Sequence, residues 1–353
     1  MDILSIPLVD SATHALSNHY YARKQALLVL ASLFAMALGT FVDYRDMVNL
    51  SPALYGATGV LLVAVLFLGR EVNGARRWIP LGFFDLQPSE LAKISMILFT
   101  AYLLSRWDGA PSSFVEFALY YAWVLVPMAL ILKQPDLGTA LVVVAATTGT
   151  LYFGGAPGKQ LMRLFVLGVV AIVIVLLLHS YAGLPLPLED YQIKRITTLF
   201  NPNADPLGTG YQVLQSKIAI GSGSLWGKGL GKGTQNRLDF IPEQQTDFIF
   251  SVVGEELGFV KSVLVLGLYV VILYRCLLAA VNSPDRRGTM VAGGVLSLFL
   301  FHLLVNIGMT MGIMPVTGVP LPFLSHGGSA LLVNSFAVGM VLNVGWRRHK
   351  ILF

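Results

Sequence analysis

The stretch IPEQQTDFIFSVVGEELGF (residues 241–259) places four carboxylates, Glu243, Asp247, Glu255 and Glu256, at the start of a long apolar run. The chain as a whole is only 12% charged and 55% hydrophobic, and its mean hydropathy is +0.71. These values are typical of an integral membrane protein. Four acidic side chains at the mouth of one apolar run therefore need a structural or functional explanation.

Around this stretch the apolar residues come in windows of about 17–22, the length an α-helix needs to cross roughly 30 Å of hydrocarbon. Strand-like alternation is absent, so the sequence predicts an all-α, polytopic helical membrane protein with a single domain over residues 1–353. We expect nine spans, near residues 26–42, 53–69, 88–105, 114–132, 138–154, 161–180, 257–281, 289–311 and 328–346.

Basic residues near the C-terminus indicate the orientation. The last span is followed by RRHK (347–350), and arginines flank the turn at 282–288, whereas the loop 312–327 has no Lys or Arg. The positive-inside rule places that turn and the C-terminus in the cytoplasm and 312–327 outside. Counting back along the spans puts a large polar loop, at about 181–245, on the outside as well.

The loop 70–87, which the same count places outside, carries Arg70, Arg76 and Arg77. One interpretation is that these arginines have no function, because the positive-inside rule is a statistical bias that individual loops can break. Alternatively they form an anion site at the outer leaflet, where arginine suits bidentate contact with phosphate. Both interpretations stay open at this point.

Other features argue against further classes of protein. The segment GSGSLWGKGLGKG (221–233) lacks the spacing of a phosphate-binding loop, so a flexible exterior loop is expected. The net charge of +5 is ordinary for a protein with basic residues beside membrane surfaces and does not indicate nucleic acid. Cys276 is the only cysteine, so no internal disulfide can form.

Charges also lie inside the predicted membrane boundary. Glu90 and Lys93 fall in the first two turns of the span 88–105, and their spacing of three puts them on one helix face. They either reach to the interface as a charge pair or face a polar cavity that opens outward. Asp136, directly before the span 138–154, is expected to cap that helix.

Asp247 is expected at the outer membrane surface, on a first segment ahead of the span proper, with Thr246 as a candidate cap. Gly254 and Gly258 are natural places for a break. Helical spacing puts Glu256 on the far side from Asp247, so the carboxylates do not all serve one pocket. A half-buried exterior carboxylate could accept a proton from a sugar hydroxyl as it attacks an anomeric carbon, while cations stabilise a departing diphosphate.

Six motifs occur in order along the chain: GARRWIPLG (74–82), QPSELAKI (87–94), QPDLGTAL (134–141), GYQVLQSKIAIGSG (210–223), GTQNRLDFIPEQQTDFIFSVVGEELG (233–258) and VNIGMTMGIMPVTGVPLPFLSHGGSA (305–330). Together they resemble the SEDS family (shape, elongation, division, sporulation) of bacterial cell-wall polymerases. The resemblance covers about residues 12–350 and is closer to the elongation member RodA than to the division member FtsW.

The resemblance implies a peptidoglycan glycosyltransferase that polymerises lipid II into β-1,4 glycan strands at the outer face of the cytoplasmic membrane, with undecaprenyl diphosphate as the leaving group. It implies that Asp247 is the catalytic base on the acceptor GlcNAc 4-hydroxyl. Arg77 and Lys93 would hold the diphosphate, and Glu90 would orient Lys93 or the sugar. The expected partners are a class B penicillin-binding protein and other proteins of the elongation complex. For cofactors we expect either none or a divalent cation, Mg or Mn, near the diphosphate.

The chain departs from the family pattern in two places. Family members usually carry ten spans, so ILSIPLV (3–9) is expected to be the tail of a missing first span, with the true start upstream; the alternative is a protein that has nine spans. His326 stands where the family usually has Tyr in SYGGS. Both side chains are amphipathic, so activity is expected to persist.

Two other functions remain as alternatives. A lipid II flippase would share the substrate, but it predicts polar residues through the full depth of the bilayer, whereas the middles of these spans are nearly free of charge. A non-catalytic scaffold for a penicillin-binding protein would explain the long exterior loop. It gives no reason for Asp247, Glu90 and Lys93 at one membrane boundary.

Overall fold

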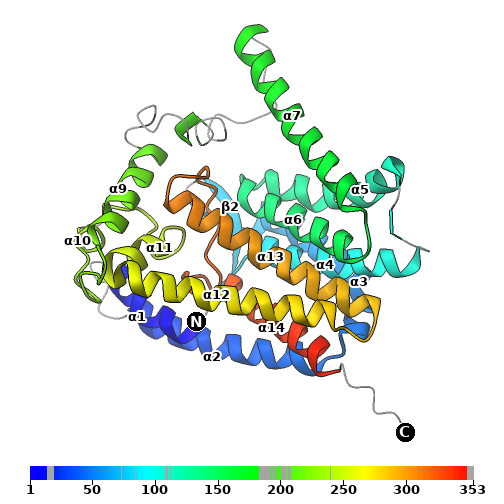
Figure 1. Cartoon of the computed structure of the whole chain (residues 1–353), viewed down its shortest axis with the longest axis horizontal. Helices are drawn as coiled ribbons and strands as arrows, with labels where there is room; N and C mark the ends of the chain where they lie inside the picture. Colours follow the sequence, from blue (N-terminus) through cyan, green and yellow to red (C-terminus); the bar gives the residue numbers. More distant parts are fainter. Residues whose placement is uncertain are drawn as a thin grey trace.

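The computed structural model describes residues 1–13, 20–72, 74–82, 84–107, 110–111, 113–182, 192, 195, 197–199, 205, 208–238 and 240–347. All nine predicted spans are helices in this structure (Figure 1). Their bounds are α2 (Tyr20–Phe41), α3 (Tyr44–Leu68), α4 (Pro88–Arg106), α5 (Phe114–Leu132), α6 (Leu137–Phe153), α7 (Gly158–Ala182), α12 (Gly258–Val281), α13 (Arg286–Thr310) and α14 (Gly328–Trp346).

Seven helices in the described part of the chain are long and apolar enough to cross a membrane: α2, α3, α5, α7, α12, α13 and α14. The other two predicted spans are weaker by these measures, because α6 has only 17 residues and α4 carries Glu90 and Lys93. Both pack inside the bundle, where α6 lies against α13 and α4 lies against α3. The all-α polytopic prediction is confirmed.

Two glycines bring α2 and α14 into backbone contact. A Cβ atom on Gly39 would lie 2.5 Å from the carbonyl oxygen of Phe336, and one on Gly339 would lie 2.2 Å from that of Met36. Small residues at a membrane helix interface allow this close approach, which replaces the hydrophobic driving force that lipid cannot supply. By contrast, α7 projects away from the bundle (Figure 1), and most of its described side chains are exposed.

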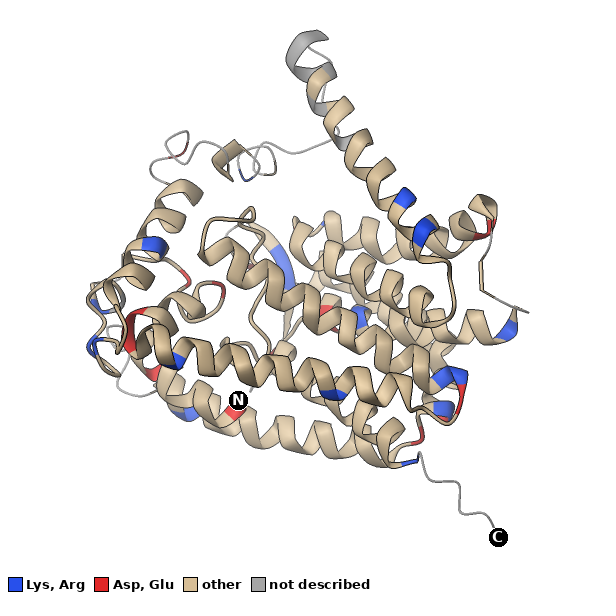
Figure 2. Ribbon diagram, in the orientation of Figure 1, with Lys and Arg blue, Asp and Glu red and all other residues tan. Residues whose placement is uncertain are grey.

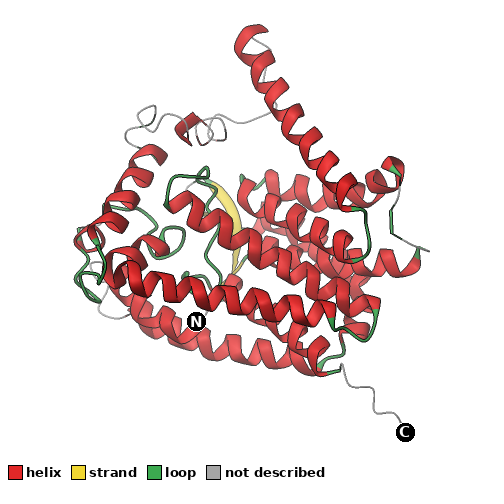
Figure 3. Cartoon of the chain, in the orientation of Figure 1, coloured by secondary structure: helices red, strands yellow, loops and turns green. Residues whose placement is uncertain are grey.

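The segments expected to be plain loops contain regular structure (Figure 3). Residues 70–87 form a small antiparallel sheet in the order β1 (Arg70–Val72), β2 (Ala75–Pro80), β3 (Asp85–Leu86). The predicted loop at about 181–245 includes α9 (Thr209–Ser222) and α10 (Thr234–Arg237), while much of its first half lies outside the described residues. At the N-terminus a short helix, α1 (Asp2–Ala12), packs against α2.

The run that follows Asp247 is interrupted before it becomes a regular span. It passes through α11 (Ile249–Val252) and a π-helical turn, η2 (Val253–Leu257), into α12. Gly258 has φ +77°, a left-handed conformation that glycine adopts without steric cost. A Cβ atom there would lie 2.1 Å from the backbone N of Gly227. The predicted break at this glycine is confirmed.

Charged residues lie mostly at the two ends of the bundle (Figure 2). The turn at 282–288 and the C-terminus share one end, and Asp247 lies at the other. Helices α4 and α12 both run from the end with Asp247 to the end with the 282–288 turn. The loops predicted to be exterior therefore meet at a single end.

Candidate functional site

A cavity of about 790 Å³ lies at the end of the bundle where the predicted exterior loops meet. It is lined by the β1–β3 hairpin, the start of α4, the turn before α6, part of α9, the turn that carries Asp247, and residues 316–330. Three of the four predicted site residues line it, namely Arg77, Glu90 and Asp247, whereas Lys93 does not. The charged residues in its wall are Arg77, Asp85, Glu90, Asp136, Arg195, Glu243 and Asp247.

Asp247 is half-buried in this cavity and lies in the turn before α11. Among the described residues, none donates a hydrogen bond to its carboxylate. Oδ2 lies close to Gly318, where a Cβ atom would be only 3.2 Å away. Thr246 does not cap a helix as predicted, because its hydroxyl bonds back to the carbonyl oxygen of Glu243 at 3.2 Å. The carboxylate of Asp247 is therefore left open to the cavity.

The pKa of Asp247 is raised to about 6. Burial is the main cause, since it disfavours the charged form, and the negative charges of Glu243 and Asp136 add to it. The positive charges of Arg195 and Arg77 act in the opposite direction and lower this pKa. A carboxyl group with this pKa is ionised at neutral pH yet basic enough to accept a proton.

The backbone around Asp247 is fixed by the C-terminal part of the chain. The three consecutive carbonyl oxygens of residues 245–247 each accept one hydrogen bond: from the backbone N–H of His326 at 2.8 Å, the hydroxyl of Ser325 at 2.5 Å and Nδ2 of Asn306 at 2.8 Å. Nδ2 of Asn306 also donates to the carbonyl oxygen of Val319 at 2.7 Å. Helix α13 and the loop that follows it thus set the position of the turn.

His326, the residue that departs from the family pattern, lines the same cavity. Its Nδ1 lies 2.7 Å from Oε1 of Gln25, whose Nε2 donates to Ser5, so Nδ1 carries the hydrogen and donates it. The ring of Tyr21 meets the imidazole edge to face at 5.5 Å. Burial first, and the charge of Lys24 second, lower the pKa of His326 to about 4. The imidazole is therefore neutral at pH 7.

Glu90 and Lys93 form a buried ion pair just behind the cavity wall. Lys93 Nζ lies 2.6 Å from Glu90 Oε2, and the two side chains are 0% and 1% exposed. Lys93 Nζ is also 3.1 Å from Nε2 of His302 on α13, and Nδ1 of His302 bonds the carbonyl oxygen of Pro320 at 3.0 Å. The pair does not reach to the interface, so that alternative is wrong. Lys93 contacts Glu90 and His302 and does not line the cavity.

Arg77 is the only one of the three hairpin arginines that lines the cavity. Its Nε donates to the carbonyl oxygen of Gln134 at 2.7 Å, and its Nη2 donates to that of Pro135. Part of the guanidinium therefore fastens the hairpin to the turn before α6. Arg76 instead forms an exposed ion pair with Glu71 at 3.2 Å.

Asp136 performs the predicted cap and also lines the cavity. Its Oδ1 accepts from the backbone N–H of Thr139 at 3.0 Å, and its Oδ2 accepts from the hydroxyl of Thr139 at 2.9 Å and from Nε2 of Gln87 at 3.2 Å. Pro88 occupies the first turn of α4, as predicted. These two helix starts give the cavity a rigid wall.

Three residues that line the cavity or support its wall were missed by the sequence analysis. Arg195 lines the cavity, but it lies in the polar loop without a motif to mark it. Asn306 and His302 could have been identified from the sequence, because they are two polar residues, four apart, in an apolar span and therefore share one helix face. Polar residues buried inside a membrane domain usually serve a site, and here they hold Asp247 and Lys93.

The other two carboxylates of the opening stretch lie outside this cavity. Glu255 is completely buried and its Oε1 accepts from Nζ of Lys228 at 2.7 Å and from the backbone N–H of Thr234 at 2.8 Å. Glu256, also completely buried, accepts from the backbone N–H of Gly231 at 3.1 Å, from that of Gly233 at 3.3 Å and from the hydroxyl of Ser11. The glycine-rich segment is therefore not the unanchored loop that its composition predicts.

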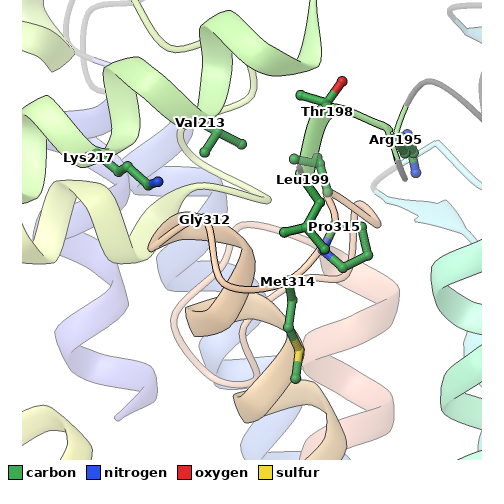
Figure 4. Close-up of a pocket in the computed structure, with 9 residues that line it drawn as sticks. Arg195, Thr198, Leu199, Val213, Lys217, Gly312, Met314 and Pro315 are labelled. Atoms are coloured by element: carbon green, nitrogen blue, oxygen red, sulfur yellow. The ribbon is translucent and has the colours of Figure 1, made fainter. Parts of the chain in front are cut away.

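A smaller hollow adjoins the main cavity (Figure 4). Arg195 and Val316 belong to both, and Lys217 of α9 lies across Gly312. Among the described residues, no group of three or more His, Cys, Asp or Glu side chains is arranged to hold a metal ion.

Residues 2–350 match the FtsW/RodA/SpoVE family of cell cycle proteins. The chain is 41% identical over 301 residues to the peptidoglycan glycosyltransferase MrdB of Escherichia coli K12, covering 85% of this chain and 79% of that protein. It is 40% identical over 330 residues to stage V sporulation protein E of Bacillus subtilis, covering 93% and 87%.

Solved structures give the same result. A peptidoglycan synthase complex, described for its coordination of polymerization and crosslinking, contains a chain that matches with a TM-score of 0.80 at 30% identity, covering 99% of this chain and 97% of that one. The crystal structure of the rod shape determining protein RodA of Thermus thermophilus matches with a TM-score of 0.71 at 30% identity, covering 99% and 94%. This chain belongs to the SEDS family of membrane proteins, as its motifs predict.

Proposed function

We propose that this chain is a peptidoglycan glycosyltransferase that polymerises lipid II into β-1,4 glycan strands at the outer face of the bacterial cytoplasmic membrane. Relatives that it matches over most of their length are named for this activity. The observation that carries the proposal is Asp247, a half-buried carboxylate with no donor among the described residues, in a cavity with several charged groups. The positive-inside rule supports the outward orientation of that cavity.

The reaction assigned to this site is a single displacement. Asp247 accepts the proton of the acceptor GlcNAc 4-hydroxyl while the hydroxyl oxygen bonds to the anomeric carbon of the donor sugar. The bond between that carbon and the diphosphate oxygen breaks, and undecaprenyl diphosphate leaves with the electron pair. Negative charge grows on the leaving group, so Arg77 and Arg195, which line the same cavity, would stabilise it.

Lys93 has a different role from the one that the resemblance implies. Because it is enclosed by Glu90 and His302, it acts as a positioning residue for Glu90, which does line the cavity. Glu90 in turn would accept hydrogen bonds from the sugar. The partner that we propose is a class B penicillin-binding protein, since the matching synthase complex combines polymerization with crosslinking.

The test is a polymerisation assay with purified protein, co-expressed with its penicillin-binding partner and incubated with lipid II. Wild type is compared with Asp247→Asn, which keeps the shape and removes the base, and with Glu243→Gln, an exposed carboxylate of the same turn. We expect glycan strands from wild type and Glu243→Gln and none from Asp247→Asn.

Equal polymer from wild type and Asp247→Asn would show that Asp247 is not the base. If no protein makes polymer although each one folds and binds the partner, the glycosyltransferase proposal fails. A lipid II flippase or a scaffold would then be the better description.

A further inference from the structure

A second cavity, of about 380 Å³, lies at the opposite end of the bundle from Asp247, where α3 begins, α4 ends and α13 begins. It has no residue in common with the Asp247 cavity. Its wall contains three arginines, one aspartate and an apolar side, formed by Arg45, Leu104, Ser105, Trp107, Asp285, Arg286 and Arg287. We propose that this cavity binds the phosphate of an anionic lipid headgroup.

The single acidic residue in the wall does not repel such a ligand, because its charge is already satisfied. Oδ1 of Asp285 accepts from the backbone N–H of Gly288 at 2.9 Å. Its Oδ2 accepts from the hydroxyl of Tyr44 at 2.8 Å and from Nε of Arg45 at 2.7 Å. Asp285 therefore orients the Arg45 guanidinium through its Nε.

The other two arginines of the cavity wall are held by different numbers of hydrogen bonds. Arg286 is anchored, since its Nε and Nη2 both donate to the carbonyl oxygen of Gly154, at 3.2 and 2.5 Å. Arg287 donates only from Nη1, to Oδ1 of Asn49 at 3.1 Å. Within the described part of the chain, Arg287 donates no other hydrogen bond, and Arg45 also interacts with the Tyr44 hydroxyl. A guanidinium that is held at one nitrogen keeps further N–H donors for the oxygens of a phosphate, which arginine binds in a bidentate manner.

The position of the cavity favours a lipid over a soluble anion. Its apolar side is Leu104 and Trp107, at the last turn of α4. The indole of Trp107 is 41% exposed and meets the ring of Tyr120 edge to face at 4.9 Å, as is usual for aromatic residues at a membrane interface. A charged wall beside an apolar wall at this depth suits a phosphate that is attached to acyl chains.

The charge pattern also fits the leaflet in which anionic lipids are expected. The positive-inside rule places the 282–288 turn on the cytoplasmic side, and Figure 2 shows basic residues gathered at this end of the bundle. Basic pockets between membrane helices on that side commonly bind acidic headgroups. Three arginines against one fully bonded aspartate leave the wall positively charged.

The experiment measures lipid retained by the full-length protein in detergent, by native mass spectrometry, after addition of phosphatidylglycerol, cardiolipin or phosphatidylcholine. Wild type is compared with Arg45→Gln/Arg287→Gln. The matched control is Arg106→Gln, which removes an exposed arginine of the same end that does not line the cavity. Wild type and the control should prefer the anionic lipids, and each lost arginine should lower that preference by about fivefold.

Two further arms keep the outcome decisive. Because Arg45 also holds Asp285, the single variant Arg287→Gln, which loses one bond to Asn49, replaces the double variant if the latter does not fold. Millimolar inorganic phosphate is added without lipid, and its effect on the thermal unfolding of wild type and variants is recorded. Equal retention of anionic lipid by all variants overturns the proposal. So does arginine-dependent stabilisation by inorganic phosphate with no preference among lipids, which would assign the cavity to a soluble phosphate compound.

Discussion

Asp247 and the pair Glu255–Glu256 lie within ten residues of one another, yet the fold treats their carboxylates in opposite ways. Glu255 and Glu256 are completely buried and accept hydrogen bonds from Lys228, from Ser11 and from several backbone N–H groups. Asp247 is half-buried and receives none from the described residues, and its pKa is raised to about 6. The number of donors around each carboxylate, and not its depth in the membrane domain, separates a structural group from one that can accept a proton.

The largest effect that would test this contrast is the loss of catalysis in Asp247→Asn. General base catalysis typically contributes about 10²- to 10⁴-fold, so polymerisation of lipid II should fall by that range. Thermal unfolding should stay unchanged, because no donor loses its acceptor. A rate within about tenfold of wild type, measured on equal amounts of folded protein, would place the base elsewhere.

The next largest effect concerns Glu90, a carboxylate whose charge is balanced by Lys93. Lys93→Met should lower the free energy of unfolding by about 3–5 kcal/mol, because it leaves a buried charge without its partner. The double variant Glu90→Gln/Lys93→Met removes both charges and should recover most of this loss, measured by unfolding in bicelles. Lys133→Met, on an exposed lysine, is the control. Equal losses in the single and double variants would contradict the coupling.

Glu256→Ala tests the structural side of the comparison. It removes the acceptor of two backbone N–H groups and of the Ser11 hydroxyl, so we expect stability to fall by about 3 kcal/mol. The rate per folded molecule should change little, since Glu256 does not line the Asp247 cavity. Glu71→Ala, which breaks only an exposed ion pair, should change stability by less than about 1 kcal/mol. If Glu256→Ala is as stable as wild type but inactive, the structural role assigned to Glu256 is wrong.

A smaller effect is expected from the residue that holds the backbone of Asp247. Asn306→Ala should lower kcat roughly tenfold through misplacement of the base, while the pH midpoint of the rate stays near that of wild type because the surroundings of the carboxylate persist. Asn343→Ala is the matched control: Asn343 is also buried and bonds the carbonyl oxygen of Thr40, but at the other end of the bundle. A kcat loss of the same size in both variants would indicate a general effect of packing.

The smallest effect concerns pH. The rate should rise as the pH passes upward through about 6, because Asp247 must lose its proton to act as a base. Glu243 raises this pKa by its negative charge, so Glu243→Gln should shift the midpoint to lower pH. At pH 5.5 the variant should be faster than wild type by less than about threefold, since the exposed charge is screened by solvent. A shift to higher pH would contradict the sign.

The features that the sequence predicts correctly are local. Nine apolar windows, Pro88 in the first turn of α4, the cap at Asp136 and the break at Gly258 all depend on residues close in the chain. The missed features depend on contacts between distant segments. Asn306 reaches a carbonyl 59 residues away, and His302 meets Lys93 across 209 residues. A pattern within one segment does not predict which polar residue of another segment it will contact.

The same distinction explains why the burial of Lys93 away from the cavity was not predicted. Its place beside Glu90 follows from a spacing of three on one helix, but its separation from the cavity depends on the packing of α13 against α4. The small sheet at 70–87 was also not predicted from the sequence. Two of its strands have only 3 and 2 residues, and the six-residue strand, ARRWIP, does not alternate between apolar and polar residues.

The ion pair of α4 has a consequence for how the protein is made. Helix α4 enters the bilayer before α13 is synthesised, and at about 5–20 residues per second the intervening stretch of about 200 residues takes roughly 10–40 s to translate. During that time His302 has not yet been synthesised, so Lys93 cannot contact it. Because Glu90 and Lys93 lie one turn apart on the same helix, each can neutralise the other from the moment of insertion, when an unpaired charge inside the membrane would be unfavourable. The nascent helix α4 thus inserts with its own counter-ion, and α13 later packs against an ion pair that is already neutral overall.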